Sequence, residues 1–138
     1  LGWVNAVEVE NSIVSISFGK IKEKGLSKQL VKLKKQINNY FLGKRYNWNF
    51  KLSINGTTLQ KKIWNEIRKI PYGKTQSYGQ IAKKIKTSPR YVGNVCSQNI
   101  HLLIIPCHRV IRSDGSLGGY SGYGGINLKK KLIKMECK

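Results

Sequence analysis

Two neighbouring residues near the end of the chain, Cys107 and His108, have side chains suited to nucleophilic chemistry. The thiolate is the reactive form of cysteine, and an adjacent histidine or arginine can lower the pKa of a thiol. Arg109 follows directly, and these polar residues come straight after the apolar run Leu102–Pro106. A polar group beside a buried run needs a partner or a task. The pattern indicates an activated cysteine, although on the dipeptide alone a packed cysteine beside a surface histidine is the more common arrangement.

A longer stretch, from Pro106 to Val110, reads Pro-Cys-His-Arg-Val and resembles the active-site signature of the O6-alkylguanine-DNA alkyltransferases, also called methylated-DNA–protein-cysteine methyltransferases. Further matches occur in the same order as in that family and cover essentially all of residues 57–138. They are Thr58-Leu59-Gln60 with Trp64, Pro71-Tyr72-Gly73, Ser77-Tyr78, Arg90, Asn99, Tyr120-Ser121-Gly122 and Glu136. Residues 1–56 match the family only in their pattern of strands and helix.

The resemblance implies an irreversible, stoichiometric reaction in which a cysteine takes the alkyl group from O6 of guanine in one displacement. Cys107 is then the acceptor, His108 removes its proton through a water, and Glu136 orients the imidazole, as in hydrolase triads. Normal guanine remains in the DNA, and O4-alkylthymine is a further candidate substrate. The protein reacts once, because a thioether is a poor leaving group. The implied reaction needs no cofactor and no metal.

The resemblance also assigns the residues that bind the damaged base. Tyr78 donates its hydroxyl to the purine as negative charge develops on the leaving guanine. The backbone N–H of Ser121 faces O6, and the carbonyls of Cys107 and Val110 accept from the exocyclic amine. Asn99 ties the DNA-reading helix to the active-site segment. The implied base pocket contains Tyr78, Val110, Tyr120, Ser121 and Gly122. The plain alternative is that the tyrosines only pack in the core and that the Ser-Gly pair only forms a turn.

The target atom is inaccessible inside a duplex, so members of the family extrude the nucleotide and fill the gap that it leaves. Arg90 matches the family's intercalating residue, on a helix that inserts into the minor groove. The implied DNA-binding residues are Arg90, Tyr91, Gly93 and Asn94. Gly93 lets the helix approach closely, whereas Tyr91 and Asn94 stand where small residues are common in the family. An exposed phosphate contact is the plain alternative for Arg90.

The charge of the chain independently favours a polyanionic partner. There are 26 Lys and Arg against 6 Asp and Glu in 138 residues, a net charge of +20, and such a surplus attracts nucleic acid. Residues 57–138 hold 16 of the basic residues and 3 of the acidic ones, so we expect the DNA-binding face there. Lysine runs such as Lys129–Lys131 are usually only a solvated helix face. No apolar run approaches the roughly 18 residues of a membrane span, so no membrane partner is expected.

Local patterns predict the elements of the N-terminal part. Apolar and polar residues alternate in 3–9, 13–18 and 48–54, which predicts three strands, with a hairpin turn at Asn11-Ser12. Apolar residues recur at three- and four-residue steps in 26–42, which predicts an amphipathic helix.

The later part of the chain has a helical texture. Thr57 or Thr58 caps a first helix, Ser77 caps a second, and Pro89 stands in the first turn of a third. The last two helices resemble a helix-turn-helix. We expect Leu102–Pro106 to be a tightly packed apolar strand, and 113–125 to be a wall of the base pocket.

The predicted fold class is α/β in two domains. Residues 1–56 form a small sheet-plus-helix domain that is ribonuclease H-like, and residues 57–138 form a mostly helical, winged-helix-like domain for DNA binding and alkyl acceptance. Both details follow from the resemblance.

The three cysteines, Cys96, Cys107 and Cys137, form an odd set without CxxC spacing. They predict free thiols in a reducing compartment, the cytoplasm or, in a eukaryote, the nucleus, and Cys96 and Cys137 are interpreted as packing. We expect a monomer that acts on double-stranded DNA carrying O6-alkylguanine. Two rival classes are a catalytically silent DNA-binding module and a thiol-dependent hydrolase or redox sensor.

Overall fold

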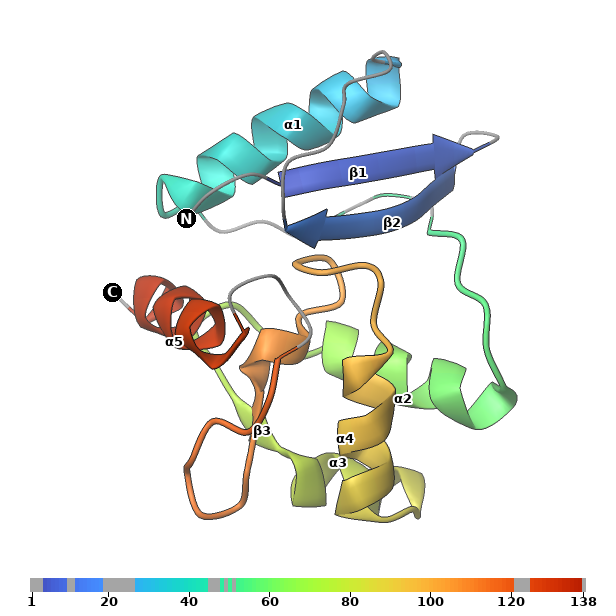
Figure 1. Cartoon of the computed structure of the whole chain (residues 1–138), viewed down its shortest axis with the longest axis vertical. Helices are drawn as coiled ribbons and strands as arrows, with labels where there is room; N and C mark the ends of the chain where they lie inside the picture. Colours follow the sequence, from blue (N-terminus) through green and yellow to red (C-terminus); the bar gives the residue numbers. More distant parts are fainter. Residues whose placement is uncertain are drawn as a thin grey trace.

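The computed structural model describes residues 4–9, 12–18, 27–44, 48, 50, 52–120 and 125–137. These residues form a mixed α/β structure with five α-helices and two sheets of two strands each. An N-terminal hairpin and one helix form the upper layer in Figure 1, and the other helices lie below it. Within the described ranges, no helix combines the length and the apolar character that crossing a bilayer requires.

The N-terminal hairpin consists of β1 (Val4–Val9) and β2 (Ser12–Phe18), which pair antiparallel. Both predicted strands are therefore confirmed, and Asn11 of the predicted turn lies outside the described residues. The side chains of Ile13 and Ile16 on β2 are fully buried. The hairpin thus turns one face of β2 toward the core.

The helix α1 (Lys28–Phe41) lies beside the hairpin (Figure 1) and confirms the helix predicted for 26–42. Its N-terminus is capped by Ser27, whose hydroxyl accepts from the backbone N–H of Leu30 at 3.1 Å. Gly43 follows the helix at φ +89°, a conformation that favours glycine. The buried stripe of α1 is formed by Leu33, Ile37 and Tyr40.

In the described part of the third predicted strand, 48–54, the only strand pairing is one isolated bridge. Leu52 forms an isolated parallel bridge with Ile13, and the backbone N–H of Ser53 donates to the Ile13 carbonyl at 2.9 Å. Asn49 and Lys51 lie outside the described residues.

Three further helices begin at the predicted positions: α2 (Thr58–Arg68), α3 (Tyr78–Ile85) and α4 (Pro89–Ser97). Thr57 caps α2 and Ser77 caps α3, each in a capping box completed by a glutamine three residues later. Ser88 caps α4, whose first residue is Pro89. Lys86 ends α3 in a left-handed conformation, which makes the link to α4 short. The helices α3 and α4 pack against each other.

A short parallel sheet joins the start of α3 to the segment that holds the cysteine. It pairs β3 (Gln76–Ser77) with β4 (Val110–Ile111). A 3₁₀ helix, η1 (Cys107–Arg109), directly precedes β4, and the last helix is α5 (Gly125–Glu136). The pairing therefore brings Tyr78, the first residue of α3, next to the active-site signature.

The apolar segment Leu102–Pro106 is a buried turn, and the prediction that it is a strand is wrong. The N–H of Ile105 donates back to the carbonyl of His101 at 2.9 Å, and Leu103 has φ +73°. The backbone therefore satisfies its hydrogen bonds locally by folding back on itself. An unbroken apolar run indicates burial but has no period that separates a strand from a turn.

The N-terminal layer is joined to the active-site segment by hydrogen bonds from β2. The N–H of Ile16 donates to the Ile100 carbonyl at 2.7 Å, and the N–H of Leu102 donates to the Ile16 carbonyl at 3.1 Å. The buried ring of His101 reaches the Ile13 carbonyl at 2.9 Å through Nε2. The hydrophobic core is accordingly one continuous cluster on both sides of residue 56.

Candidate active site

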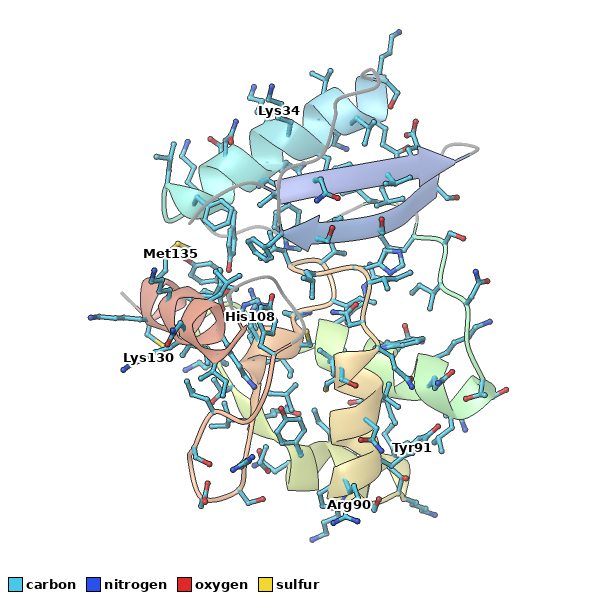
Figure 2. The ribbon with its side chains drawn as sticks, viewed as in Figure 1. Lys34, Arg90, Tyr91, His108, Lys130 and Met135 are labelled. Atoms are coloured by element: carbon cyan, nitrogen blue, oxygen red, sulfur yellow. The ribbon has the colours of Figure 1, made fainter. Side chains whose placement is uncertain are left out.

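The three signature residues Cys107, His108 and Arg109 lie in η1 and are all buried, with exposed fractions of 4%, 0% and 6%. A 3₁₀ helix has about three residues per turn, so consecutive side chains diverge by roughly a third of a turn. Cys107 accordingly lines a cavity, while the other two side chains contact Glu136 on α5. Figure 2 shows His108 next to α5.

Glu136 binds the two residues that follow the cysteine through its two carboxylate oxygens. His108 Nε2 lies 2.7 Å from Glu136 Oε2. Arg109 donates from Nε to Oε1 at 2.7 Å and from Nη2 to Oε2 at 3.0 Å, which is a bidentate pair. Arg109 also donates from Nη1 to the Ile70 carbonyl at 2.8 Å, so its position is secured from a second side.

The pKa values in this cluster keep the carboxylate charged and the imidazole neutral. Burial alone would raise the pKa of Glu136, but hydrogen bonds from His108 and Arg109 outweigh burial and lower it. Burial lowers the pKa of His108 and outweighs the opposing pull of Glu136. A neutral imidazole that donates from Nε2 to a carboxylate carries its lone pair on Nδ1. Nδ1 of His108 is buried and has no hydrogen-bond partner among the described residues.

The sulfur of Cys107 is held by Asn99. The amide nitrogen of Asn99 lies 3.2 Å from Cys107 Sγ and 2.9 Å from the Ile105 carbonyl, and its oxygen accepts from the His101 N–H at 2.8 Å. Burial raises the pKa of the Cys107 thiol to about 11, although Asn99 and the charge of Lys129 oppose the rise. The resting thiol is therefore protonated at neutral pH. Asn99 follows α4 by two residues, so its hydrogen bonds run from the segment just after this helix to the cysteine segment.

A cavity of about 740 Å³ opens in front of Cys107. Its wall combines the start of α3, one side of α4 and the segment after β4, with Tyr78, Arg90, Gly93, Cys96, Cys107 and Tyr120 among the lining residues. Gly118 lies against Tyr78, because a Cβ atom at this glycine would come within 2.9 Å of the tyrosine hydroxyl. The segment 113–120 thus contributes to the wall of this cavity, and residues 121–124 of the predicted wall 113–125 lie outside the described residues.

Lys129 is a site residue that the sequence analysis missed. It is fully buried, whereas Lys130 and Lys131 are exposed, so the solvated-face interpretation holds only for the latter two. Its ammonium donates to Tyr78 Oη at 3.3 Å, to the Gly119 carbonyl at 3.2 Å and to the Leu117 carbonyl. The available signal was helical spacing, because Lys129 shares a face with the buried residues Leu132 and Glu136, three and seven positions later.

The implied DNA-binding residues all lie on α4. Arg90 and Asn94 are exposed, and Tyr91 and Gly93 are partly buried. Figure 2 shows Arg90 and Tyr91 at the end of α4 that is far from the hairpin. A Cβ atom at Gly93 would make only ordinary contact with the Tyr78 ring at 3.9 Å. The space beside Gly93 is therefore not required by packing within the protein.

Of the four remaining residues of the predicted base pocket, the structure describes two. Val110 is buried and pairs with Gln76 in the parallel sheet. Tyr120 lines the cavity, and its buried hydroxyl has no partner among the residues that the structure describes. Ser121 and Gly122 lie outside the described residues.

The other two cysteines are both free thiols. Cys96 is buried in the wall of the same cavity as Cys107, and Cys137 is exposed. In the described part of the chain, no cluster of three or more His, Cys, Asp or Glu side chains could hold a metal ion.

Comparisons with known proteins agree on one family. Residues 58–138 match the family profile described as "6-O-methylguanine DNA methyltransferase, DNA binding domain". A methylated-DNA–protein-cysteine methyltransferase of Sulfolobus acidocaldarius is 39% identical, in an alignment that covers 99% of this chain and 87% of the relative. The protein of the same name from Metallosphaera sedula is 38% identical, covering 98% of this chain and 86% of the relative. The crystal structure of Mycobacterium tuberculosis OGT in complex with DNA superimposes with a TM-score of 0.82 at 31% identity, over 97% of this chain and 86% of that one.

Proposed function

Because the chain belongs to the 6-O-methylguanine DNA methyltransferase family, we propose that Cys107 is the residue that accepts the alkyl group. The protein is a methylated-DNA–protein-cysteine methyltransferase, which repairs DNA by irreversible transfer of an alkyl group from O6-alkylguanine to its own cysteine. The observation that carries the assignment is the placement of Cys107 in the wall of the cavity, next to a histidine that is paired with a buried carboxylate. Cys96 lines the same cavity, but its neighbours in the chain, Val95 and Ser97, offer no histidine that could act as a base.

His108 is the proposed base. The thiol of Cys107 has a raised pKa and must lose its proton as the sulfur attacks. Nδ1 of His108 carries the free lone pair and takes this proton through a water, while Glu136 stabilises the imidazolium that forms. The ionised carboxylate is already in place before the reaction, because the pKa of Glu136 is lowered.

The transfer is a single displacement at the alkyl carbon. The bond from Cys107 Sγ to carbon forms as the bond from carbon to O6 breaks, and the electron pair of that bond moves into the guanine. Tyr78 donates its hydroxyl to the purine to stabilise this negative charge, and Lys129 supports the hydroxyl. The guanine anion takes up one proton, which balances the proton lost by the thiol, so the products are guanine in DNA and a thioether on Cys107. The protein reacts once, because the thioether does not leave.

The DNA contacts are proposed from the surface of α4. Arg90 is exposed and lines the cavity together with Gly93, so one helix face is open to solvent and also borders the cavity. We assign Arg90 to the gap left by the extruded nucleotide, and Tyr91, Gly93 and Asn94 to the minor groove. The lesion is O6-alkylguanine in double-stranded DNA, and O4-alkylthymine is a second candidate. Val110, Tyr120, Ser121 and Gly122 complete the proposed base pocket.

We also propose the finer architecture from the family. Residues 1–56 are a ribonuclease H-like domain, and residues 57–138 are a winged-helix-like domain in a protein that acts as a monomer. The helix pair α3 and α4, packed together through a short link, supports the second assignment.

The test is mass spectrometry of the protein after reaction with an oligonucleotide that contains O6-methylguanine. We expect one methyl group on the peptide with Cys107, no transfer by Cys107→Ala, and normal transfer by Cys96→Ala, a matched change of a thiol in the same cavity. Cys107→Ala should still bind DNA. Several turnovers, or a methyl group on another residue, would overturn the assignment.

A further inference from the structure

The carboxylate of Glu136 has a third hydrogen-bond donor, which comes from the N-terminal layer. The hydroxyl of Tyr40, near the end of α1, donates to Glu136 Oε2 across 96 positions of the sequence. The same oxygen accepts from His108 Nε2 at 2.7 Å and from Arg109 Nη2 at 3.0 Å. Tyr40 itself is 1% exposed. No signature motif of the C-terminal part contains this residue.

We propose that Tyr40 is a positioning residue for alkyl transfer: its hydroxyl holds Glu136 Oε2 against His108 so that Nδ1 stays free to take the thiol proton. This inference rests on the proposed function, in which His108 is the base. Tyr40 acts through Glu136 and touches neither the DNA nor the reacting atoms. The N-terminal layer would then contribute to the chemistry as well as to stability.

The ring of Tyr40 is held on several sides, which fixes the direction of its hydroxyl. Phe41 meets it edge-on with ring centres 5.2 Å apart, Trp48 lies at 5.8 Å, and Tyr72 meets it edge-on at 5.9 Å. Tyr72 also lies under the guanidinium of Arg109, 5.7 Å from its ring centre. Tyr72 therefore contacts two of the three donors to Glu136, namely Tyr40 and Arg109.

A fixed donor on Oε2 has two chemical effects. It limits rotation of the carboxylate, so the oxygen that contacts His108 stays the same throughout the reaction. It also favours the charged form of Glu136, because a hydrogen bond to a carboxylate stabilises the anion. A less basic carboxylate leaves the proton on the imidazole when the imidazolium forms, which is the state that the mechanism requires.

A purely structural role is the competing explanation, since buried hydroxyl groups are normally hydrogen-bonded. The two explanations differ in their pH dependence. Without the Tyr40 hydroxyl, the pKa of Glu136 rises, and a more basic carboxylate raises the pKa of His108 in turn. His108 then becomes protonated, and inactive as a base, at a higher pH. A role of Tyr40 in packing alone would leave the pH at which His108 becomes protonated unchanged. The groups that face this pair are Arg109, Tyr72, Tyr120 and Lys129.

The experiment compares wild type with Tyr40→Phe, which keeps the ring and removes only the hydroxyl. Single-turnover rates are measured from pH 5 to 9 on duplex DNA containing O6-methylguanine, together with DNA affinity and thermal melting. We expect the rate at neutral pH to fall about tenfold, as for the loss of one hydrogen bond to a charged group. The acid limb of the profile should move to higher pH, with unchanged affinity. Ile37→Val, one turn earlier on the buried face of α1, is the control for packing.

A second variant keeps the test decisive if Tyr40→Phe does not fold. Site-specific 3-fluorotyrosine at position 40 preserves the ring and makes the hydroxyl a stronger donor, so the acid limb should move to lower pH. Identical profiles in wild type and this variant would overturn the role of Tyr40 while leaving alkyl transfer to Cys107 intact. A wild-type protein that places no methyl group on Cys107 would instead overturn the proposed function.

Discussion

The ammonium of Lys129 lies 3.3 Å from the hydroxyl oxygen of Tyr78, in a position where the lysine is fully buried. The ammonium also lies 5.5 Å from the centre of the Tyr78 ring. Two backbone carbonyls, those of Leu117 and Gly119, accept its other hydrogen bonds. The lysine therefore links α5, the segment after β4 and the first residue of α3. A cation that donates to the tyrosine oxygen makes the hydroxyl a better donor to the purine.

Replacing Lys129 should slow the transfer without preventing folding. Burial lowers the pKa of Lys129 to about 8, so the ammonium is charged at neutral pH and loses its charge as the pH rises through that value. We expect Lys129→Met to react about tenfold more slowly at pH 7, because one charge-assisted hydrogen bond is lost. The support from Lys129 should fade above pH 8, so the variant and wild type should differ less at pH 9.

Single-turnover rates at both pH values check this expectation. Lys130→Met, a change at the exposed neighbouring lysine, is the control. A ratio of rates that stays constant between pH 7 and pH 9 would contradict the role of the charge.

A methyl group at Gly118 should displace the hydroxyl of Tyr78. The added Cβ would lie 2.9 Å from Tyr78 Oη, and Gly118 has φ +71°. We expect Gly118→Ala to lose about 1 kcal/mol or more of stability, because the left-handed conformation disfavours alanine, and to react at least tenfold more slowly. Gly119→Ala is the matched control, since its Cβ would meet no atom within 4 Å. Melting curves and transfer rates separate the two effects, and equal rates in the two variants would count against a role for Tyr78.

Arg90 should matter for duplex DNA and not for a free base. Only the duplex reaction requires extrusion of the nucleotide, at a cost of a few kcal/mol. We expect Arg90→Ala to slow repair of duplex DNA about tenfold or more, and to leave the reaction with free O6-benzylguanine unchanged. Arg90→Lys keeps the positive charge and should remain slow. A fully active Arg90→Lys would indicate a simple phosphate contact, and equal losses on both substrates would place Arg90 in the pocket or the fold.

The alkylated protein should be less stable than the fresh one. Cys107 is 4% exposed, and Asn99 lies 3.2 Å from its sulfur, so an added alkyl group crowds the contact that joins α4 to the cysteine segment. Overpacking typically costs about 1–3 kcal/mol, which corresponds to a fall of about 3–10 °C in melting temperature for a chain of this size. Benzyl should have a larger effect than methyl. Melting curves of the three forms check this, and an unchanged melting temperature would show that the cavity absorbs the group.

Much of the helical framework could be predicted from the sequence, because its signals are local. Ser27, Thr57, Ser77 and Ser88 each cap a helix through hydrogen bonds that span three residues. The family was also predictable, because five consecutive residues, Pro106–Val110, carry a specific signature, and the comparisons confirm it. The roles assigned to Tyr78, Arg90 and the other site residues stay predictions.

The rest was decided by contacts between distant segments. The run Leu102–Pro106 is apolar in either conformation, and the hydrogen bond from Leu102 to Ile16 of β2 and the burial of the run in the common core are contacts with distant segments. Lys129 is the same residue type as its exposed neighbours Lys130 and Lys131. Its buried ammonium finds partners only in the tertiary structure, at the carbonyls of Leu117 and Gly119. Tyr40 meets Glu136 across 96 positions. Sequence patterns report periods and caps within a few residues, whereas the partners of a buried polar group are chosen by the tertiary structure that excludes water around it.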